Sequence, residues 1–175
     1  GALGGGRLRA LVLTDFAGHG NRHGGLLGPA GALRQFERCV TDAGTSPLRA
    51  VMVVGSATQI AMRDAVDLVP IFEDVLGAPV RVSPSADAPH IGVLVTSGVS
   101  TARIVRGVSE MLVRGDVQVV VGTRGLFGEG WDCPAVNTLV DVTSVATASA
   151  TQQVRGRTLR LDPAWPEKVA HNWTV

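Results

Sequence analysis

Short runs of Val, Leu, Ile and Met recur along this chain between longer stretches with helical spacing, and this alternation constrains the fold most. The runs are almost continuously apolar, which is typical of strands buried on both faces of a sheet. Strands that alternate with helices form parallel sheets. The sequence therefore predicts a three-layer α/β domain with a mainly parallel central sheet. We expect its strands at 8–14, 49–55, 91–97, 116–122 and 137–143.

The stretches between these runs predict helices. One of them begins at Ser56, a good N-cap residue, and contains Pro70, which should kink or split it. Ligands of parallel sheets bind at the carboxyl ends of the strands. We expect helices at 29–44, 56–77, 100–115 and 149–160. We expect the loops after Thr14, Gly55, Thr96, Gly122 and Thr143 to share one edge.

The composition excludes several classes of protein. The chain is 45% hydrophobic and 18% charged, which is a globular composition. No apolar run approaches the ~20 residues of a membrane span. Its two cysteines, Cys39 and Cys133, indicate a reduced, cytoplasmic setting. Because the chain opens with a Gly-rich segment and has no initiator Met, we expect it to be a piece of a longer protein.

Two later segments carry chemistry. The loop GTRGLFGEGWDCP, residues 122–134, follows an apolar run, and its glycines permit close approach of the backbone to a ligand. Thr123 can offer a hydroxyl and a backbone N–H to a nucleic-acid phosphate. In QQVRGRTLR, residues 152–160, Arg157 and Arg160 are three apart and share a helix face. Two guanidinium groups can therefore meet one phosphate.

Together, these segments resemble motifs V and VI of superfamily 2 helicases and translocases. ALVLTDF lies where motif IV opens the second RecA-like domain of that family, near 10–16. The resemblance is specific over about 91–162. It implies a RecA-like helicase C-terminal domain over 1–162, with 163–175 as a tail or the start of another element. The residues that match Q-x-x-G-R-x-x-R are Gln153, Gly156, Arg157 and Arg160.

The resemblance implies roles at ATP. Arg157 and Arg160 would be arginine fingers, and Gln153 would bind the phosphate or the attacking water. Asp132 would accept hydrogen bonds from the ribose hydroxyls. Gly130 and Gly156 would also lie at the nucleotide.

The same resemblance implies contacts with a nucleic-acid backbone, which we expect to be DNA. The residues concerned are Thr96, Ser97, Gly98, Thr123 and Arg124. The loop from Thr123 to Gly130 is one residue longer than the common family pattern, and Trp131 stands where a small aliphatic residue is usual.

No G-x-x-x-x-G-K-[ST] phosphate loop exists in this sequence, whose single lysine is Lys168. No Asp-Glu pair of the Walker B type is present either. ATP and Mg²⁺ would be bound mainly by a preceding RecA-like domain of the same protein. We therefore expect a nucleic-acid-dependent ATPase in the intact protein, and no activity from this chain alone.

Other interpretations remain open. The domain could be a non-motor RecA-like or Rossmann-like module that binds a nucleotide or a protein, or the motor of a restriction or defence enzyme. Asp132 could simply form a turn before Pro134, and Trp131 is expected in the core. His19 and His23 lie four apart among glycines, which indicates a solvated loop instead of a metal site.

Overall fold

A computed structural model describes residues 7–14, 29–43, 48–55, 57–128, 130–143, 152, 155, 156 and 158–174. The elements, in chain order, are β1 (Ala10–Thr14), α1 (Pro29–Ala43), β2 (Ala50–Val54), β3 (Ala57–Ala61), the 3₁₀ helix η1 (Met62–Asp64), α2 (Ala65–Leu76), β4 (Val80–Pro84), β5 (Ile91–Thr96), α3 (Thr101–Arg114), β6 (Val119–Thr123), α4 (Arg124–Phe127), β7 (Thr138–Asp141) and β8 (His171–Thr174).

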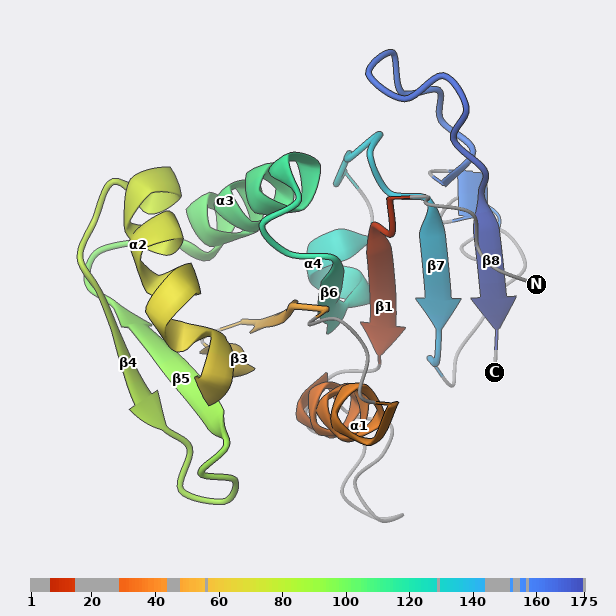
Figure 1. Cartoon of the computed structure of the whole chain (residues 1–175). Coiled ribbons are helices and arrows are strands. Elements are labelled where there is room, and N and C mark those ends of the chain that lie inside the picture. The colour runs from red at the N-terminus through yellow and green to blue at the C-terminus, as the bar shows by residue number, and fades with distance from the viewer. Residues whose placement is uncertain are drawn as a thin grey trace.

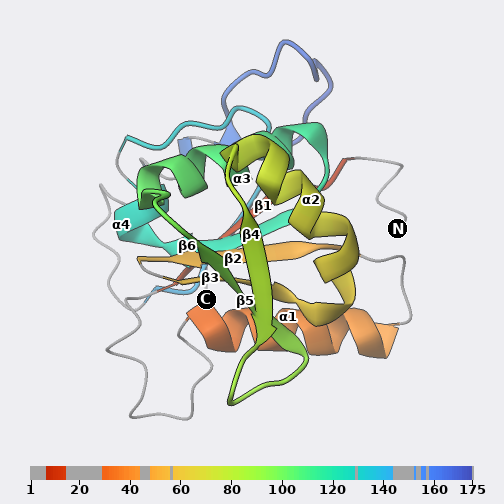
Figure 2. The same ribbon diagram turned by 90° about the vertical axis from the view of Figure 1, so that its left-hand side faces the viewer.

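The strands form one mixed sheet in the order β4-β5-β3-β2-β6-β1-β7-β8. β2, β6, β1, β7 and β8 run parallel to one another, whereas β3 runs against them. β5 pairs antiparallel with β3 and β4, so β5 runs in the direction of the parallel group. Twist turns β4 and β5 steeply across the other strands in Figure 2. The α/β class and the five predicted strands are confirmed, with an antiparallel portion added.

Helices cover both faces of this sheet, as Figures 1 and 2 show. Alternate strand residues point to opposite faces. Val51 and Val53 of β2 belong to the core beneath α2, α3 and α4. Ala50 and Met52 belong to a second core with Leu33 of α1. This is the predicted three-layer arrangement.

The first part of the predicted helix 56–77 is wrong. Its residues Ala57–Ala61 form β3, in which Ala57 lies opposite Val54 of β2. Gly55 turns the chain with a φ of +32°. Gly-Ser between apolar runs is a hairpin signal, and here it prevails over the helical spacing. The N-cap predicted at Ser56 falls on a residue outside the described ones.

α2 begins at Ala65 and runs through Pro70 without a break, so the expected split does not occur. Pro70 is exposed, while Leu68 and Phe72 are fully buried on the opposite stripe. The missing N–H of Pro70 therefore lies on the solvent side of the helix, where it leaves the core contacts intact.

Two further strands, β4 and β8, were not predicted either. β8 pairs with β7 at one edge of the sheet, so the segment after residue 162 returns to the same sheet. Among the described residues, no helix has the length and apolar character needed to cross a bilayer.

Candidate functional site

The loop after β6 is held by buried aromatic side chains. Phe127, in the one-turn helix α4, is fully buried and packs its ring edge-on against Trp131, with centroids 5.2 Å apart. A Cβ on Gly122 would lie 2.3 Å from the Phe127 ring, and a Cβ on Gly128 would lie 2.0 Å from the Arg124 carbonyl oxygen. These two glycines are therefore required by packing.

The next side chains of the loop, at residues 131–133, alternate between the core and the solvent. Trp131 is 8% exposed and its indole donates to the Ser109 hydroxyl on α3, at 2.8 Å. Cys133 is buried, and this burial raises the pKa of its thiol, which disfavours a nucleophilic thiolate. Asp132, between them, is exposed. Gly130 has a φ of +80°, a conformation that favours glycine. The core position expected for Trp131 is confirmed.

Asp132 meets Arg160. The Arg160 guanidinium lies 2.5 Å from the Asp132 carboxylate, and both side chains are about half exposed, at 50% and 52%. The two residues come from the two separate motifs of the sequence. The fold thus brings together one predicted arginine finger and the predicted ribose acceptor.

Lys168 contacts the last part of this loop, before β7. Its ammonium group donates to the carbonyl oxygens of Pro134, at 2.6 Å, and Val136, at 3.2 Å. Partial burial lowers the pKa of this lysine. The sequence predicted residues 163–175, which include Lys168, to be a tail or the start of another element, because a lone lysine between prolines and apolar residues offers no spacing signal.

The segment of the second motif is described only in part. Gln152, Arg155, Gly156 and Thr158 are helical. Arg155 donates to the Thr174 hydroxyl and the Thr158 hydroxyl to the Asn172 side chain, at 2.6 and 3.0 Å, so this helix packs on β8. A Cβ on Gly156 would meet open space, so no close approach to a neighbour explains it here. Gln153 and Arg157 lie outside the described residues, and their roles stay predictions.

The residues predicted to contact nucleic acid at the end of β6 have internal partners or little exposure. Thr123 is 4% exposed. Arg124 pairs with Asp141, the last residue of β7, at 2.5 Å. Asp141 is 1% exposed and also accepts from the backbone N–H and the hydroxyl of Thr143, at 3.2 and 2.7 Å. The contacts of Thr123 and Arg124 with nucleic acid stay predictions.

Thr96, Ser97 and Gly98 lie where β5 leads into α3. Ser97 and Gly98 are exposed, and Gly98 has a φ of +71°. Ser100 caps α3 by accepting from the Arg103 backbone N–H at 3.3 Å. The Thr101 hydroxyl donates to the Gly55 carbonyl oxygen at 2.9 Å, which joins this turn to the end of β2. β1, β2, β5, β6 and β7 all run in one direction, so their carboxyl ends lie at the same edge of the sheet, as predicted.

The candidate residues fall into two groups. Thr123 and Arg124 lie at the carboxyl end of β6, beside the end of β1. The loop then crosses to the amino end of β7, where Asn137 accepts from the Arg9 backbone N–H before β1, at 3.0 Å. In Figure 1 this loop lies at the upper end of the sheet with the blue segment that contains Arg160. The residues predicted for ATP and for nucleic acid are thus separated.

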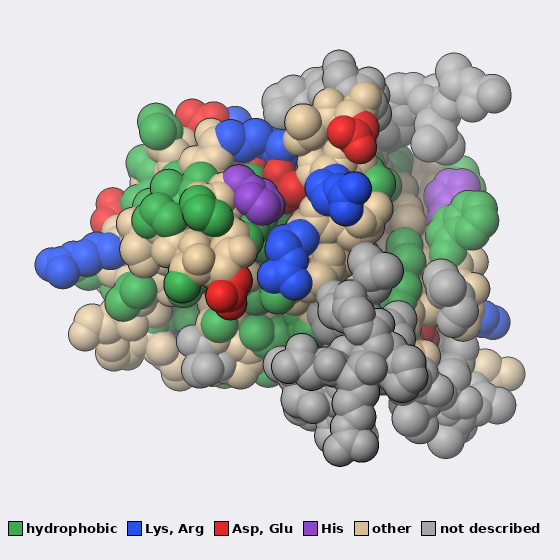
Figure 3. Space-filling view, turned by 90° about the horizontal axis from the view of Figure 1, so that it is seen from below, with side chains coloured by type: hydrophobic (Ala, Val, Ile, Leu, Met, Phe, Trp, Pro, Cys, Tyr) green, Lys and Arg blue, Asp and Glu red, His purple; other side chains and the backbone are tan. Residues whose placement is uncertain are grey.

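The opposite end, toward which β1, β7 and β8 point in Figure 1, faces the viewer in Figure 3. Over its described part, basic side chains are interspersed with acidic ones. This agrees with the net charge of +1 and gives no broad basic patch on the atoms shown in colour.

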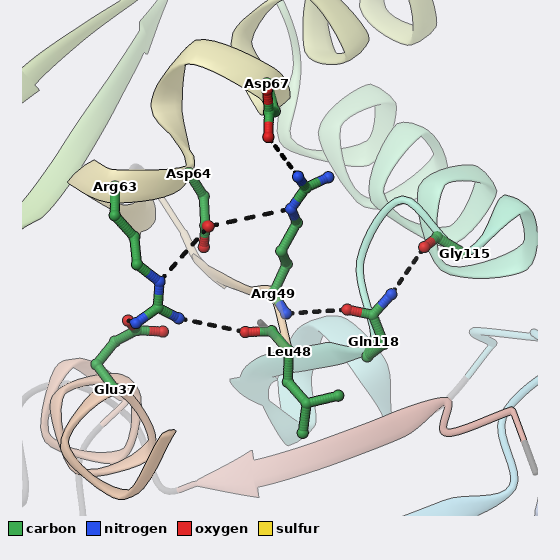
Figure 4. Close-up of polar contacts among 8 residues, drawn as sticks. All are labelled: Glu37, Leu48, Arg49, Arg63, Asp64, Asp67, Gly115 and Gln118. Atoms are coloured by element: carbon green, nitrogen blue, oxygen red, sulfur yellow. Dashed lines mark hydrogen bonds and ion pairs between the residues drawn. The ribbon is translucent and has the colours of Figure 1, made fainter. Parts of the chain in front are cut away.

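A cluster of charged side chains, two of them buried, lies near the amino ends of β2 and β6 (Figure 4). Glu37 and Asp64 are each 5% exposed, and Arg63 contacts them at 2.7 and 3.5 Å. Arg49 adds contacts with Asp64, at 4.0 Å, and with Asp67. Burial raises the pKa of both Glu37 and Asp64, and Arg63 only partly offsets this. Sequence spacing gave no sign of this cluster, because its members come from α1, η1, α2 and the segment before β2.

Within the described residues, no group of three or more His, Cys, Asp or Glu side chains is placed to hold a metal ion. Comparison with models of known protein families and with curated proteins finds no match.

Proposed function

We propose that this chain is the C-terminal motor domain of an ATP-dependent superfamily 2 helicase or translocase acting on nucleic acid, with DNA as the expected strand. A preceding RecA-like domain of the same protein supplies the phosphate loop and most of the contacts with ATP and Mg²⁺. This chain supplies arginine fingers and half of the nucleotide and nucleic-acid sites. The setting is the cytoplasm.

The contact between Arg160 and Asp132 carries this proposal. A fold in which the Gly-rich loop and the arginine segment were unrelated would give no reason for these two residues to meet. Their side chains are half exposed, so a nucleotide can reach them. Phosphoryl transfer depends on positioned charge more than on covalent chemistry, and a guanidinium at the γ-phosphate supplies that charge.

ATP occupancy would change this pair. The ribose hydroxyls would donate to Asp132, and Arg160 would turn to the phosphates. Because an exposed ion pair is worth only about 0–1 kcal/mol, separating the two groups costs little. The proposed half-site is compatible with a cleft that closes on ATP and opens after hydrolysis.

The test is ATP hydrolysis by the natural protein, with and without single-stranded DNA. We expect DNA to stimulate turnover, and Arg160→Ala to lower the stimulated rate by at least about 100-fold, since arginine fingers contribute ~10³–10⁵ in GTPases. Arg114→Ala is the matched control: this exposed arginine pairs with Asp74 and with Glu110 on α3.

Turnover that is absent under both conditions contradicts the motor and favours the binding module. Turnover that ignores Arg160 keeps the motor and contradicts the role of this residue as a finger. Stimulation by RNA and not by DNA would change only the identity of the strand.

A further inference from the structure

The ion pair between Arg124 and Asp141 joins the ends of two strands across the strand that lies between them. Arg124 is the first residue after β6, and Asp141 is the last residue of β7. β1 lies between these strands, with Thr14 beside Thr123 and Leu13 beside Asp141. The arginine side chain therefore reaches over the carboxyl end of β1 to its partner.

Both carboxylate oxygens of Asp141 are engaged. Oδ2 accepts from Arg124 at 2.5 Å, and Oδ1 accepts from the Thr143 backbone N–H and hydroxyl. The Asp141 side chain is 2% exposed and that of Arg124 is 21% exposed. The Arg124 Nε is buried and has no hydrogen-bond partner among the described residues. Asp141 therefore sets both the direction of Arg124 and the turn by which the chain leaves β7.

A phosphate would have to compete with this carboxylate. If Arg124 turned to a nucleic-acid strand, Asp141 would remain buried with its cationic partner removed, and an uncompensated buried charge is strongly unfavourable. A strand could be met instead by neutral groups, such as the hydroxyls and backbone N–H groups near the ends of β5 and β6. Arg124 is thus better suited to hold the loop than to bind the strand.

We propose that Arg124 and Asp141 are positioning residues: their ion pair, called the lock below, fixes the junction of β6 and α4 to the end of β7 and so holds Thr123 in place for the nucleic-acid backbone. The part of this inference that concerns nucleic acid rests on the proposed function. The lock itself is a property of the fold and has its own measurement.

The test uses Arg124→Gln, Asp141→Asn and the double variant in the natural protein, with Arg114→Gln as the control. We expect each single change to lower DNA stimulation of ATP turnover at least about 5-fold. The double variant should lose no more than either single one, because the two act as a unit. The salt dependence of binding to single-stranded DNA should stay as in the natural protein, because Thr123 carries no charge and releases no counterion. Arg124→Lys, which keeps a charge, should restore part of the stimulation.

A second measurement needs no activity. The backbone N–H of Thr143 donates to the Asp141 carboxylate. The rate of hydrogen exchange of this amide should rise at least about 10-fold in Arg124→Gln and remain unchanged in Arg114→Gln. Arg124→Lys also covers the case in which the glutamine variant does not fold.

The outcomes separate the two proposals. No DNA-dependent turnover in the natural protein, with faster exchange in Arg124→Gln, contradicts the proposed function and retains the lock. Normal turnover with unchanged exchange overturns the lock. A DNA affinity that falls in Arg124→Gln, with the salt slope reduced by about 0.7, identifies Arg124 as a phosphate ligand and also overturns it.

Discussion

At the scale of single residues, Glu37 shows that a helical stripe can carry a charge into the core. Leu33, Glu37 and Val40 share the buried face of α1, and the apolar positions alone were visible in the sequence. Burial raises the pKa of Glu37 above its ordinary value of 4.5. The protonated carboxyl is thus favoured in the folded state. Its contribution to stability is complete below the unfolded pKa and is lost as pH rises through the folded pKa.

Glu37→Gln should therefore flatten the pH dependence of stability above pH 4.5. The amide resembles the protonated carboxyl, so the free energy of unfolding near neutral pH should stay equal or rise, although the contact with Arg63 is weakened. Urea unfolding at several pH values measures this. A marked loss of stability at neutral pH would instead show that the ion pair outweighs burial.

Two glycines of the candidate site should respond in opposite ways to alanine. Gly122→Ala places a Cβ 2.3 Å from the Phe127 ring and 3.1 Å from the Val53 carbonyl oxygen. We expect a loss of about 1–3 kcal/mol, as for other overpacked cores. Gly156→Ala meets open space in a helix and should gain about 0.4–1 kcal/mol.

Denaturant unfolding of Gly122→Ala and Gly156→Ala, measured under the same conditions, tests these two predictions. If Gly156→Ala is stabilised while ATP turnover in the natural protein falls, the glycine serves a ligand or another domain, as the motif predicts. Equal effects of the two substitutions would contradict the packing described around Gly122.

At the scale of elements, the sequence predicted the strands because each is a nearly continuous apolar run. It did not predict β3, since the apolar spacing of 56–77 fits a helix and only the Gly-Ser dipeptide indicates a hairpin. β8 was missed because HNWT is mostly exposed. For the candidate site, the resemblance to helicase motifs V and VI implied that Asp132 and Arg160 serve one nucleotide, whereas the partner of Arg124 depends on strand order. Asp141 reads in the sequence as one polar residue within an apolar strand.

α2 offers a test of how a helix tolerates proline. Pro70 removes one backbone hydrogen bond inside α2. Pro70→Ala should stabilise the protein by about 1–2 kcal/mol, less than the ~3 kcal/mol cost of an interior proline, because alanine also frees the unfolded chain. Pro29→Ala should give no gain, because proline suits the first residue of α1. Thermal unfolding of both variants measures these changes in stability. A lower stability of Pro70→Ala would mean that the proline ring itself makes stabilising contacts.

At the scale of the whole molecule, charge and topology together limit how this chain would contact the proposed nucleic acid. The net charge is +1, and the described face in Figure 3 mixes both signs. Arg124 is engaged by Asp141, so the remaining candidates for the strand are the neutral groups Thr96, Ser97, Gly98 and Thr123. Neutral donors release no condensed counterions when they contact a phosphate.

The salt dependence of binding should therefore be shallow. Each phosphate neutralised on a single strand contributes a slope of about −0.7 in log K against log salt. For this chain alone we expect a weak affinity and a slope no steeper than about −1.5, equivalent to two cationic contacts. Fluorescence anisotropy with a labelled single strand between low and physiological salt measures the slope. A much steeper slope would require a basic surface that the face in Figure 3 does not show. It would mean that this domain, and not a preceding one, supplies the electrostatic part of binding.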